Sequence, residues 1–306
     1  MKKSKYNFNN ETKKLSLIIG LIILSIFIGI FERIDSASTS AASVIPKSSV
    51  MVIPIEGMIS GMGSQWEGSV VDIFMDQLQE AKESKSVKAV VLRINSPGGT
   101  VGASQEMYDA VERFKAQSKK PVVVSIMDVG ASGAYWVALA ADQIFAHPGS
   151  IVGSLGVITQ TFDLTQVPNK YGVDVVTYKS GKHKDLLNPW RKPTKEDKSL
   201  IYKMLNTVHA QFYNKLVENR NIPVKQAKVI ADGRIFSGQD ALDESLIDQL
   251  GGLYDAIQYA GGLVNIDDPK VVYPNRGFKN WFQSFRAMAN SLMQVTPSSI
   301  SSFGMQ

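Results

Sequence analysis

The sequence predicts an α/β protein with a parallel sheet and flanking helices, preceded by an N-terminal transmembrane helix. Two observations predict the sheet: β-branched apolar runs alternate with segments of helical spacing, and these runs are continuously apolar instead of alternating with polar residues. Continuous apolar runs are typical of parallel strands that helices cover on both faces. A third observation, a long uncharged run close to the first residue, predicts the membrane helix.

Composition excludes several classes of protein and of site. The 306 residues suffice for one large domain or two small ones, and the absence of cysteine excludes a disulfide framework, a cysteine nucleophile and a thiolate metal site. Three histidines leave little material for a metal centre, so we expect neither a metal nor another cofactor. The net charge of +5 is concentrated in residues 1–14, where five lysines accompany one glutamate. The rest of the chain is nearly neutral, and we expect no nucleic-acid partner.

Residues 15–31 form an uncharged apolar run, LSLIIGLIILSIFIGIF, at the short end of what spans a bilayer. The lysines of residues 1–14 precede it, so the positive-inside rule assigns that basic tail to the cytoplasm and the rest of the chain to the outside of the cell membrane. A cleaved signal peptide is the alternative, because small residues suited to cleavage lie within 36–42. We favour a single-pass signal anchor, followed by a linker at residues 32–49 that is rich in Ser and Ala.

The folded domain begins with strands and helices in alternation. The β-branched run at 50–55 predicts the first strand, and apolar residues three and four apart at 70–82 predict the first helix. The run at 87–94, which ends at a glycine pair, predicts the second strand. The next elements follow by the same criteria: an amphipathic helix at 103–116, a strand at 121–127, a helical segment at 130–141 and a short strand at 143–145.

The second half of the domain is predicted to be mostly helical. The β-branched run at 173–178 predicts one further strand, and apolar residues at helical spacing predict a long helix at 195–219. Two shorter helices are predicted at 223–232 and 239–249. They complete a domain that we expect to span residues 50–265.

Residues 266–306 form a basic, aromatic tail that differs from the domain. Aromatic side chains recur at three- and four-residue spacing after residue 276, and no acidic residue follows Asp268. A helix of this kind suits the surface of an anionic membrane, and we expect residues 276–293 to contact membrane lipid. Packing on the domain itself or on a neighbouring subunit is the alternative.

Glycine-rich turns follow two of the predicted strands, at 95–99 and at 128–136. The carboxyl ends of neighbouring parallel strands border the crevice in which open α/β sheets bind ligands. Glycine lets the backbone bring its amides close to a ligand, and a helix that starts near Ser132 adds its positive end. The combination predicts a hydroxyl nucleophile beside an oxyanion hole made of backbone amides.

A serine nucleophile needs a general base, and the sequence offers two kinds. His147, His183 and His209 stand in no recognisable triad setting. A lysine can replace histidine where burial holds its amine neutral, and the loop at 179–185 carries three lysines. The residues alone leave the choice between histidine and lysine open.

Five short motifs carry a resemblance to a known family. They are Ile94-Asn-Ser-Pro-Gly-Gly99, Gly130-Ala-Ser-Gly-Ala-Tyr135, Gly149-Ser-Ile-Val-Gly-Ser-Leu-Gly156, Tyr178-Lys-Ser-Gly-Lys-His-Lys-Asp185 and Asp232-Gly-Arg-Ile-Phe-Ser-Gly238. In their order and spacing, residues 48–262 resemble the short bacterial form of the signal peptide peptidase A family. That family consists of serine peptidases with the crotonase-like (Clp protease-like) fold.

The resemblance implies a role for each residue that matches a family motif. Ser132 is implied to be the nucleophile and Lys184 the general base, with Lys182 as the nearest competitor. A neutral lysine would take the serine proton, and the alkoxide would attack a peptide carbonyl.

The same resemblance implies the surroundings of this Ser/Lys dyad. The oxyanion amides would be those of Gly133 and of Gly99 or its neighbour Gly98. Ser154 would hold the lysine by a hydrogen bond, and an ordinary turn serine is the alternative at that position.

The implied protein is a membrane-anchored serine endopeptidase that degrades cleaved signal peptides and other hydrophobic peptides, with its catalytic domain outside the cell. Relatives of this fold assemble as rings, so we expect a homo-oligomer, and the dyad is open to completion across subunits. An acyl-CoA enzyme of the crotonase type and a non-catalytic membrane scaffold share the fold and are the alternatives. Neither alternative needs both a serine and a lysine.

Overall fold

The computed structural model describes residues 48–63 and 68–274. The predicted basic tail, membrane anchor and membrane-surface segment, at 1–14, 15–31 and 276–293, lie outside these residues. No helix within the described ranges is long and apolar enough to cross a bilayer.

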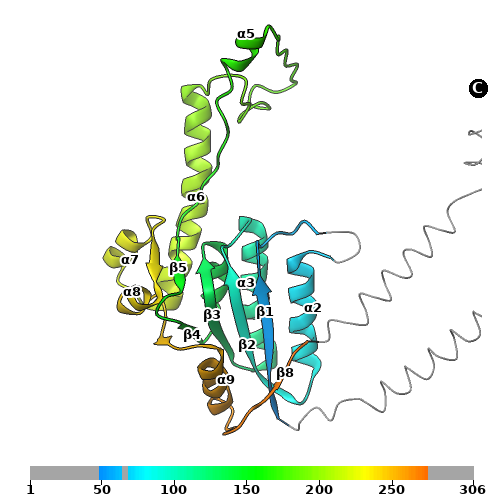
Figure 1. The fold of residues 1–306 in the computed structure, drawn as a ribbon, viewed down its shortest axis with the longest axis vertical. Helices are drawn as coiled ribbons and strands as arrows, with labels where there is room; N and C mark the ends of the chain where they lie inside the picture. The colour runs from blue at the N-terminus through cyan, green and yellow to red at the C-terminus, as the bar shows by residue number, and fades with distance from the viewer. Residues whose placement is uncertain (1–47, 64–67, 275–306) are drawn as a thin grey trace, which may run out of the picture. The chain divides into compact units, whose positions relative to one another are not determined.

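One eight-stranded sheet forms the centre of the described domain (Figure 1). Its strands follow the order β6-β5-β3-β2-β1-β8, while β4 pairs with β3 and β7 pairs with β4. Every pairing is parallel except that of β5 with β6, which confirms the prediction of a parallel sheet. The strands are β1 (Ser49–Glu56), β2 (Val87–Ser96), β3 (Val122–Ala131), β4 (Gln143–Ala146), β5 (Ile151–Gly153), β6 (Ile235–Ser237), β7 (Gln249–Leu250) and β8 (Lys270–Val272).

Helices cover both faces of this sheet. Helices α2, α3 and α4 pack on one face with α6 and α7 beyond them, and α9 packs on the other face. The helices are α2 (Val70–Glu83), α3 (Val101–Ser118), α4 (Gly133–Ala138), α5 (Val167–Tyr171), α6 (Lys195–Arg220), α7 (Val224–Ile230), α8 (Gly238–Asp243) and α9 (Leu253–Gly262).

The continuously apolar strands divide their side chains between two cores. In β1, Val50 and Val52 pack with Ala256 of α9, while Ile53 packs with Phe74 of α2 on the opposite face. All five side chains are buried, and each large aliphatic side chain removed from water contributes about 1.5–3 kcal/mol. A strand buried on both faces has no solvent-facing position, which explains why its sequence does not alternate.

The longest helix, α6, projects from the sheet and carries a separate group of segments at its amino-terminal end (Figure 1). It begins at a capping box, in which Thr194 accepts a hydrogen bond from the Asp197 amide and Asp197 accepts one from the Thr194 amide. Its other end is anchored in the core, where Phe212 stacks on Trp136 with ring centroids 4.7 Å apart. We call residues 157–204, which include the first turns of α6, the arm.

The predicted strand at 173–178 is wrong. This segment is irregular and lies in the arm, where every side chain from 171 to 182 is exposed. A strand needs a partner for its backbone hydrogen bonds, and no described strand lies beside this segment. The β-branched residues that suggested a strand favour an extended backbone in a sheet, but they do not show that a neighbouring strand is present.

The limits of the domain also differ from the expected ones. Strand β1 begins at Ser49, a residue assigned to the linker, and β8 joins the sheet after residue 265, the expected end. Strands β5 and β6 were not expected, and the segment 239–249 contains the short helix α8 and the start of β7 instead of one helix.

Candidate active site

The two glycine-rich turns meet at the carboxyl ends of β2 and β3, as the sequence predicts. Ser96 at the end of β2 is paired with Gly130 of β3. Beyond them Gly98, at φ +95°, lies so close to the second turn that a Cβ atom there would come within 2.6 Å of the Gly133 nitrogen and 2.9 Å of the Ser132 Cβ. Only glycine fits this position, both for its backbone angle and for the space available.

Ser132 is the residue before α4, and its backbone is held in an unusual conformation. Its φ of 52° and ψ of −124° lie in a region that residues with a side chain rarely occupy. Two hydrogen bonds fix it: the Ser132 amide donates to the Gly153 carbonyl at 2.8 Å, and the Ser132 carbonyl accepts from the Trp136 amide at 3.0 Å. The hydroxyl makes no hydrogen bond to another described residue, so it is available for chemistry.

Two backbone amides beside Ser132 are also available. The amides of Gly99 and Gly133 donate no hydrogen bond to any other described residue. They lie close together, because a Cβ atom on Gly133 would come within 3.3 Å of the Gly99 nitrogen. Two unpaired amides next to a serine hydroxyl form the arrangement that stabilises an oxyanion.

Buried neighbours that the sequence did not reveal hold these glycines in place. The side chain of Ser104 in α3 packs on Gly133, so that a Cβ there would come within 2.1 Å of the Ser104 oxygen. Ile59 bridges the first turn, since its amide donates to the Gly98 carbonyl at 2.9 Å and its carbonyl accepts from the Thr100 amide at 2.9 Å. No spacing rule connects either residue to the glycines, because both contacts depend on tertiary packing.

Ser154 directly follows β5, the strand that pairs with the end of β3 beside Ser132. It follows Gly153 of β5, which pairs with Ala131 of β3 and accepts the hydrogen bond from the Ser132 amide. Its own amide donates to the Arg234 carbonyl at 2.8 Å, and its φ is 52°. The structure thus brings Ser154 close to Ser132, and the Ser154 hydroxyl makes no hydrogen bond within the described chain.

The lysines of the 179–185 loop differ in what they contact. Lys179 pairs with Asp185 at 2.7 Å, and Lys182 pairs with Glu196 at 2.5 Å. Lys184 is exposed and forms no ion pair or side-chain hydrogen bond with a described residue. Of the three lysines, Lys184 is the one whose amine is not already engaged.

Within one chain, the structure does not bring Lys184 to Ser132. The loop is attached to the first turn of α6 through Arg191, which pairs with Asp197, whereas Ser132 lies near the other end of that helix beside the Trp136–Phe212 contact. From Asp197 to Phe212 an α-helix rises about 22 Å. Ser132 and the 179–185 loop are therefore separated by most of the length of the arm.

The three histidines are engaged away from the serine. His209 shares a hydrogen bond of 2.6 Å with the Ala231 carbonyl, and the His147 ring packs against the backbone of Gly252. His183 lies 3.3 Å from Glu196 at the start of α6. No described contact links any of them to Ser132.

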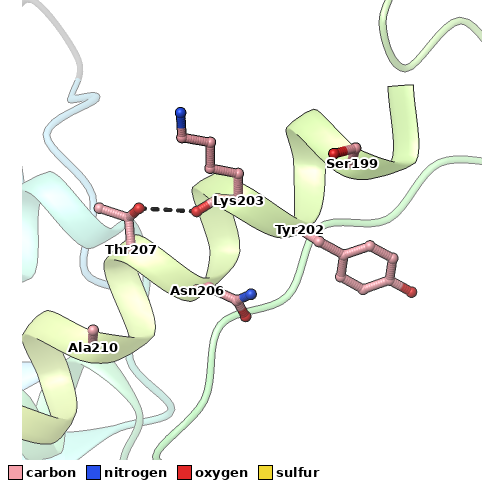
Figure 2. A pocket seen from close by; sticks show the side chains of 6 residues that line it. All are labelled: Ser199, Tyr202, Lys203, Asn206, Thr207 and Ala210. Carbon is pink, nitrogen blue, oxygen red and sulfur yellow. Dashed lines mark hydrogen bonds between the residues drawn. The ribbon is translucent and has the colours of Figure 1, made fainter. Parts of the chain in front are cut away.

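Two hollows of the described surface lie on the arm and its helix. One, of about 750 Å³, follows one side of α6, and Figure 2 shows the side chains that line it, with Tyr202 and Lys203 projecting in different directions. Its lining residues are Ser199, Tyr202, Lys203, Asn206, Thr207 and Ala210. The other hollow, of about 400 Å³, is lined by residues 184–188. Neither contains Ser132.

Comparison with known proteins gives two family matches. A model of Peptidase family S49 matches residues 114–267, which hold Ser132, Ser154 and Lys184. A model described as Clp protease matches residues 49–152, which hold both glycine-rich turns. The fold is thus a Clp protease-like α/β fold.

Three relatives illustrate the similarity. A candidate protease of Methanocaldococcus jannaschii is 39% identical over 199 residues, which cover 65% of this chain and 63% of that protein. A candidate protease of Synechocystis sp. is 39% identical over 189 residues, covering 62% of this chain and 68% of that protein. A candidate signal peptide peptidase SppA of Enterococcus faecium is 35% identical over 184 residues, covering 60% and 53%. The chain spans between about half and two thirds of the length of these relatives.

Proposed function

The chain belongs to Peptidase family S49, and from that premise we propose that it is a serine endopeptidase with Ser132 as nucleophile and Lys184 as general base. The observation that carries the proposal is the Ser132 hydroxyl beside the amides of Gly99 and Gly133, none of which has a hydrogen-bond partner among residues 48–63 and 68–274. A nucleophile next to two convergent donors suits acyl transfer, in which a carbonyl oxygen becomes an anion.

The proposed reaction passes through a serine ester. The neutral amine of the lysine accepts the Ser132 proton, and the serine oxygen attacks the peptide carbonyl. The two amides stabilise the tetrahedral oxyanion. The lysine then donates its proton to the leaving amine as the C–N bond breaks, and a water molecule, activated by the same amine, hydrolyses the ester.

The contacts of the loop support Lys184 over Lys182 as the base. An amine that is already paired with a carboxylate is held in its charged form and cannot accept a proton. Lys182 is paired with Glu196, whereas Lys184 has no such partner in the part of the chain that the structure describes. Ser154 is proposed to orient the lysine amine, because it directly follows the strand β5 beside the nucleophile and its hydroxyl has no partner among the described residues.

We propose that the dyad is completed between two copies of the chain in a homo-oligomeric ring. The length of α6 between Ser132 and the 179–185 loop argues against a dyad within one chain. The arm also exposes a concentration of large apolar side chains, a property of surfaces that bind another protein. They include Ile158, Phe162, Tyr171, Val173, Val176 and Tyr178.

The proposed substrates are cleaved signal peptides and other hydrophobic peptides. The Enterococcus faecium relative is named as a signal peptide peptidase, which supports this class. Two exposed methionines, Met58 and Met62, flank Ile59 where it bridges the first glycine turn, and flexible thioether side chains suit apolar peptides of varied sequence. We further propose that residues 15–31 anchor the enzyme in the cell membrane with its catalytic domain outside, and that residues 276–293 contact lipid.

A fluorophosphonate probe, which modifies activated serines, tests the proposal. The full chain in detergent micelles is expected to be labelled and to cleave a fluorogenic peptide with apolar residues. Ser132→Ala and Lys184→Ala are expected to lose both properties, and Lys182→Ala is expected to keep most of its rate.

Each other outcome has a definite meaning. Labelling of Ser132→Ala at the wild-type rate would overturn the nucleophile assignment. An inactive Lys182→Ala beside an active Lys184→Ala would move the base by two positions. A wild-type chain that is neither labelled nor active would favour the scaffold or the acyl-CoA enzyme.

A further inference from the structure

Arg191 holds the loop that carries the proposed base. Its Nε donates to Asp185 Oδ2 at 2.9 Å, and its Nη2 donates to Asp185 Oδ1 and to the Asp185 carbonyl, both at 3.1 Å. Its Nη1 donates to Asp197 Oδ2 at 2.6 Å and to the Lys192 carbonyl at 3.3 Å. One guanidinium thus joins Asp185 of the loop to Asp197 in the first turn of α6.

Both carboxylates are nearly buried, although the loop around them is exposed. The side chains of Asp185 and Asp197 are 9% and 7% exposed. Asp185 is the residue next to Lys184, so its charge is the nearest negative charge to the proposed base along the chain. The structure directs this carboxylate toward Arg191 and Lys179, and Lys184 has no carboxylate partner among the described residues.

We propose that Arg191 is a positioning residue that keeps the Asp185 carboxylate away from the Lys184 amine. The inference rests on the proposed role of Lys184 as general base. A carboxylate within a few ångströms of a lysine stabilises the ammonium form, which is the form that cannot accept the serine proton. Arg191 removes this competitor and at the same time fixes the backbone of the loop to α6.

The other charged groups around Asp185 and Asp197 do not replace Arg191 in this role. Lys179 contacts Asp185 through a single ammonium, while Lys182 and His183 face Glu196, and His183 also lies 4.0 Å from Asp197. Lys192 and Asp163 are further charged residues of the arm, and the first turn of α6 also carries Lys195 and Lys198. Only a planar guanidinium bonds both oxygens of Asp185 and reaches Asp197 as well, which a lysine at position 191 would not achieve.

The test is the pH dependence of kcat/KM for the full chain in detergent micelles, measured with the fluorogenic peptide. In Arg191→Gln, Asp185 loses its main partner, and the acidic limb of the profile is expected to move by about one unit to higher pH. At neutral pH this is a loss of about tenfold, which disappears on the alkaline side. Adding Asp185→Asn to this variant is expected to return the limb to its wild-type position, because the competing charge is gone.

Two further variants make the result specific. Arg191→Lys is expected to return the acidic limb part of the way to its wild-type position, since lysine restores the positive charge but cannot bond both oxygens of Asp185. Lys182→Gln, which takes a cation of the same loop away from Glu196, serves as the matched control and is expected to stay within twofold of wild type at every pH.

Two results would overturn the proposal. One is a loss in Arg191→Gln that is the same at every pH, and the other is a double variant that keeps the shifted limb. If Arg191→Gln does not fold, Asp185→Asn in the otherwise unchanged chain decides, because electrostatic competition predicts an unmoved or lower limb and a purely structural role predicts a loss at every pH. Failure of the base assignment is seen separately, as activity that survives in Lys184→Ala.

Discussion

Ser132, the proposed nucleophile, has a backbone conformation that a serine adopts only under constraint. The two hydrogen bonds to Gly153 and Trp136 hold it there, and a residue with a side chain in such a region costs about 1–3 kcal/mol. Strain of this kind is common where a catalytic group must project from a turn, because the turn directs the side chain away from the protein surface that supports it.

This strain predicts that removal of the side chain stabilises the fold. Ser132→Gly is expected to abolish activity and to raise the free energy of unfolding by about 1 kcal/mol, since glycine occupies this conformation without strain but loses more backbone entropy. For a domain of this size the melting temperature would rise by about 2–4 °C. Ser132→Ala keeps the strained conformation and is expected to melt with the wild type, so calorimetry that finds the two variants equal would contradict the account.

A second prediction concerns the contact between Gly133 and Ser104. Gly133→Ala is expected to lower the labelling rate by about 100-fold, because the new methyl group would push an oxyanion amide out of position. Ser104→Gly in the same chain opens the space that the methyl group needs. The double variant is expected to be labelled about tenfold faster than Gly133→Ala alone. A double variant that is no faster than Gly133→Ala would show that something other than this collision disables the enzyme.

For single residues, the sequence predicted which motif residues lie together at the candidate site, but it did not predict the neighbours that tertiary packing places beside them. The serine and the glycines follow from their places after two parallel strands, because the topology of such a sheet sets where the strand ends meet. Ser104 and Ile59 come from elements whose only signal is apolar spacing. The sequence placed Lys182 beside Lys184 as a competitor but could not show which amine is paired, since that depends on which one meets a carboxylate in three dimensions.

In the arm, ion pairs join the loop at 179–191 to the first turn of α6. Hydrogen bonds from Arg191 hold the pKa values of Asp185 and Asp197 below their usual range, and Lys179 adds to the effect on Asp185. A carboxyl group with a lowered pKa in the folded state stabilises that state above the ordinary value, near pH 3.9, and the contribution is lost as the pH falls through the lowered value.

The loop at 179–191 is therefore expected to stay structured under mildly acidic conditions. Amides that donate within the loop, such as those of Lys184, Leu186 and Asn188, should keep their protection from hydrogen exchange down to about pH 4. In Arg191→Gln the protection should already be reduced at neutral pH. Loss of protection between pH 5 and 6 in the wild type would show that these carboxylates do not hold the loop.

The arm is also where prediction from the sequence was least successful at the scale of elements. The helices and strands of the core were predicted because each buries a continuous apolar run or stripe against its neighbours. The segment 173–178 carries the same residue types without such neighbours in the described chain, so its composition suggested a strand that does not form. A segment whose apolar side chains suit another copy of the protein gives a false signal when one chain is considered alone.

For the whole molecule, the proposal of a dyad shared between copies predicts complementation. A mixture of equal amounts of Ser132→Ala and Lys184→Ala chains, each inactive alone, is expected to regain about a quarter of wild-type activity after dissociation and reassembly. The quarter is the chance that a site combines an intact serine from one copy with an intact lysine from the next. No recovery, although size measurements show that mixed oligomers have formed, would mean that the dyad lies within one chain.

The pairing of β1 with β8 has a consequence for the synthesis of the protein. Of the strands that the structure describes, β1 is the first to be made, and its outer neighbour β8, at residues 270–272, is the last. At the usual rate of translation, on the order of 10–40 s separates the two, and throughout that time Ser49, Val50 and Met51 lack their outer neighbour, which leaves this part of β1 open to another nascent strand. The first three residues of β1 therefore gain their outer partner only when β8 is made, and a chain interrupted before residue 270 would leave that part of β1 without it.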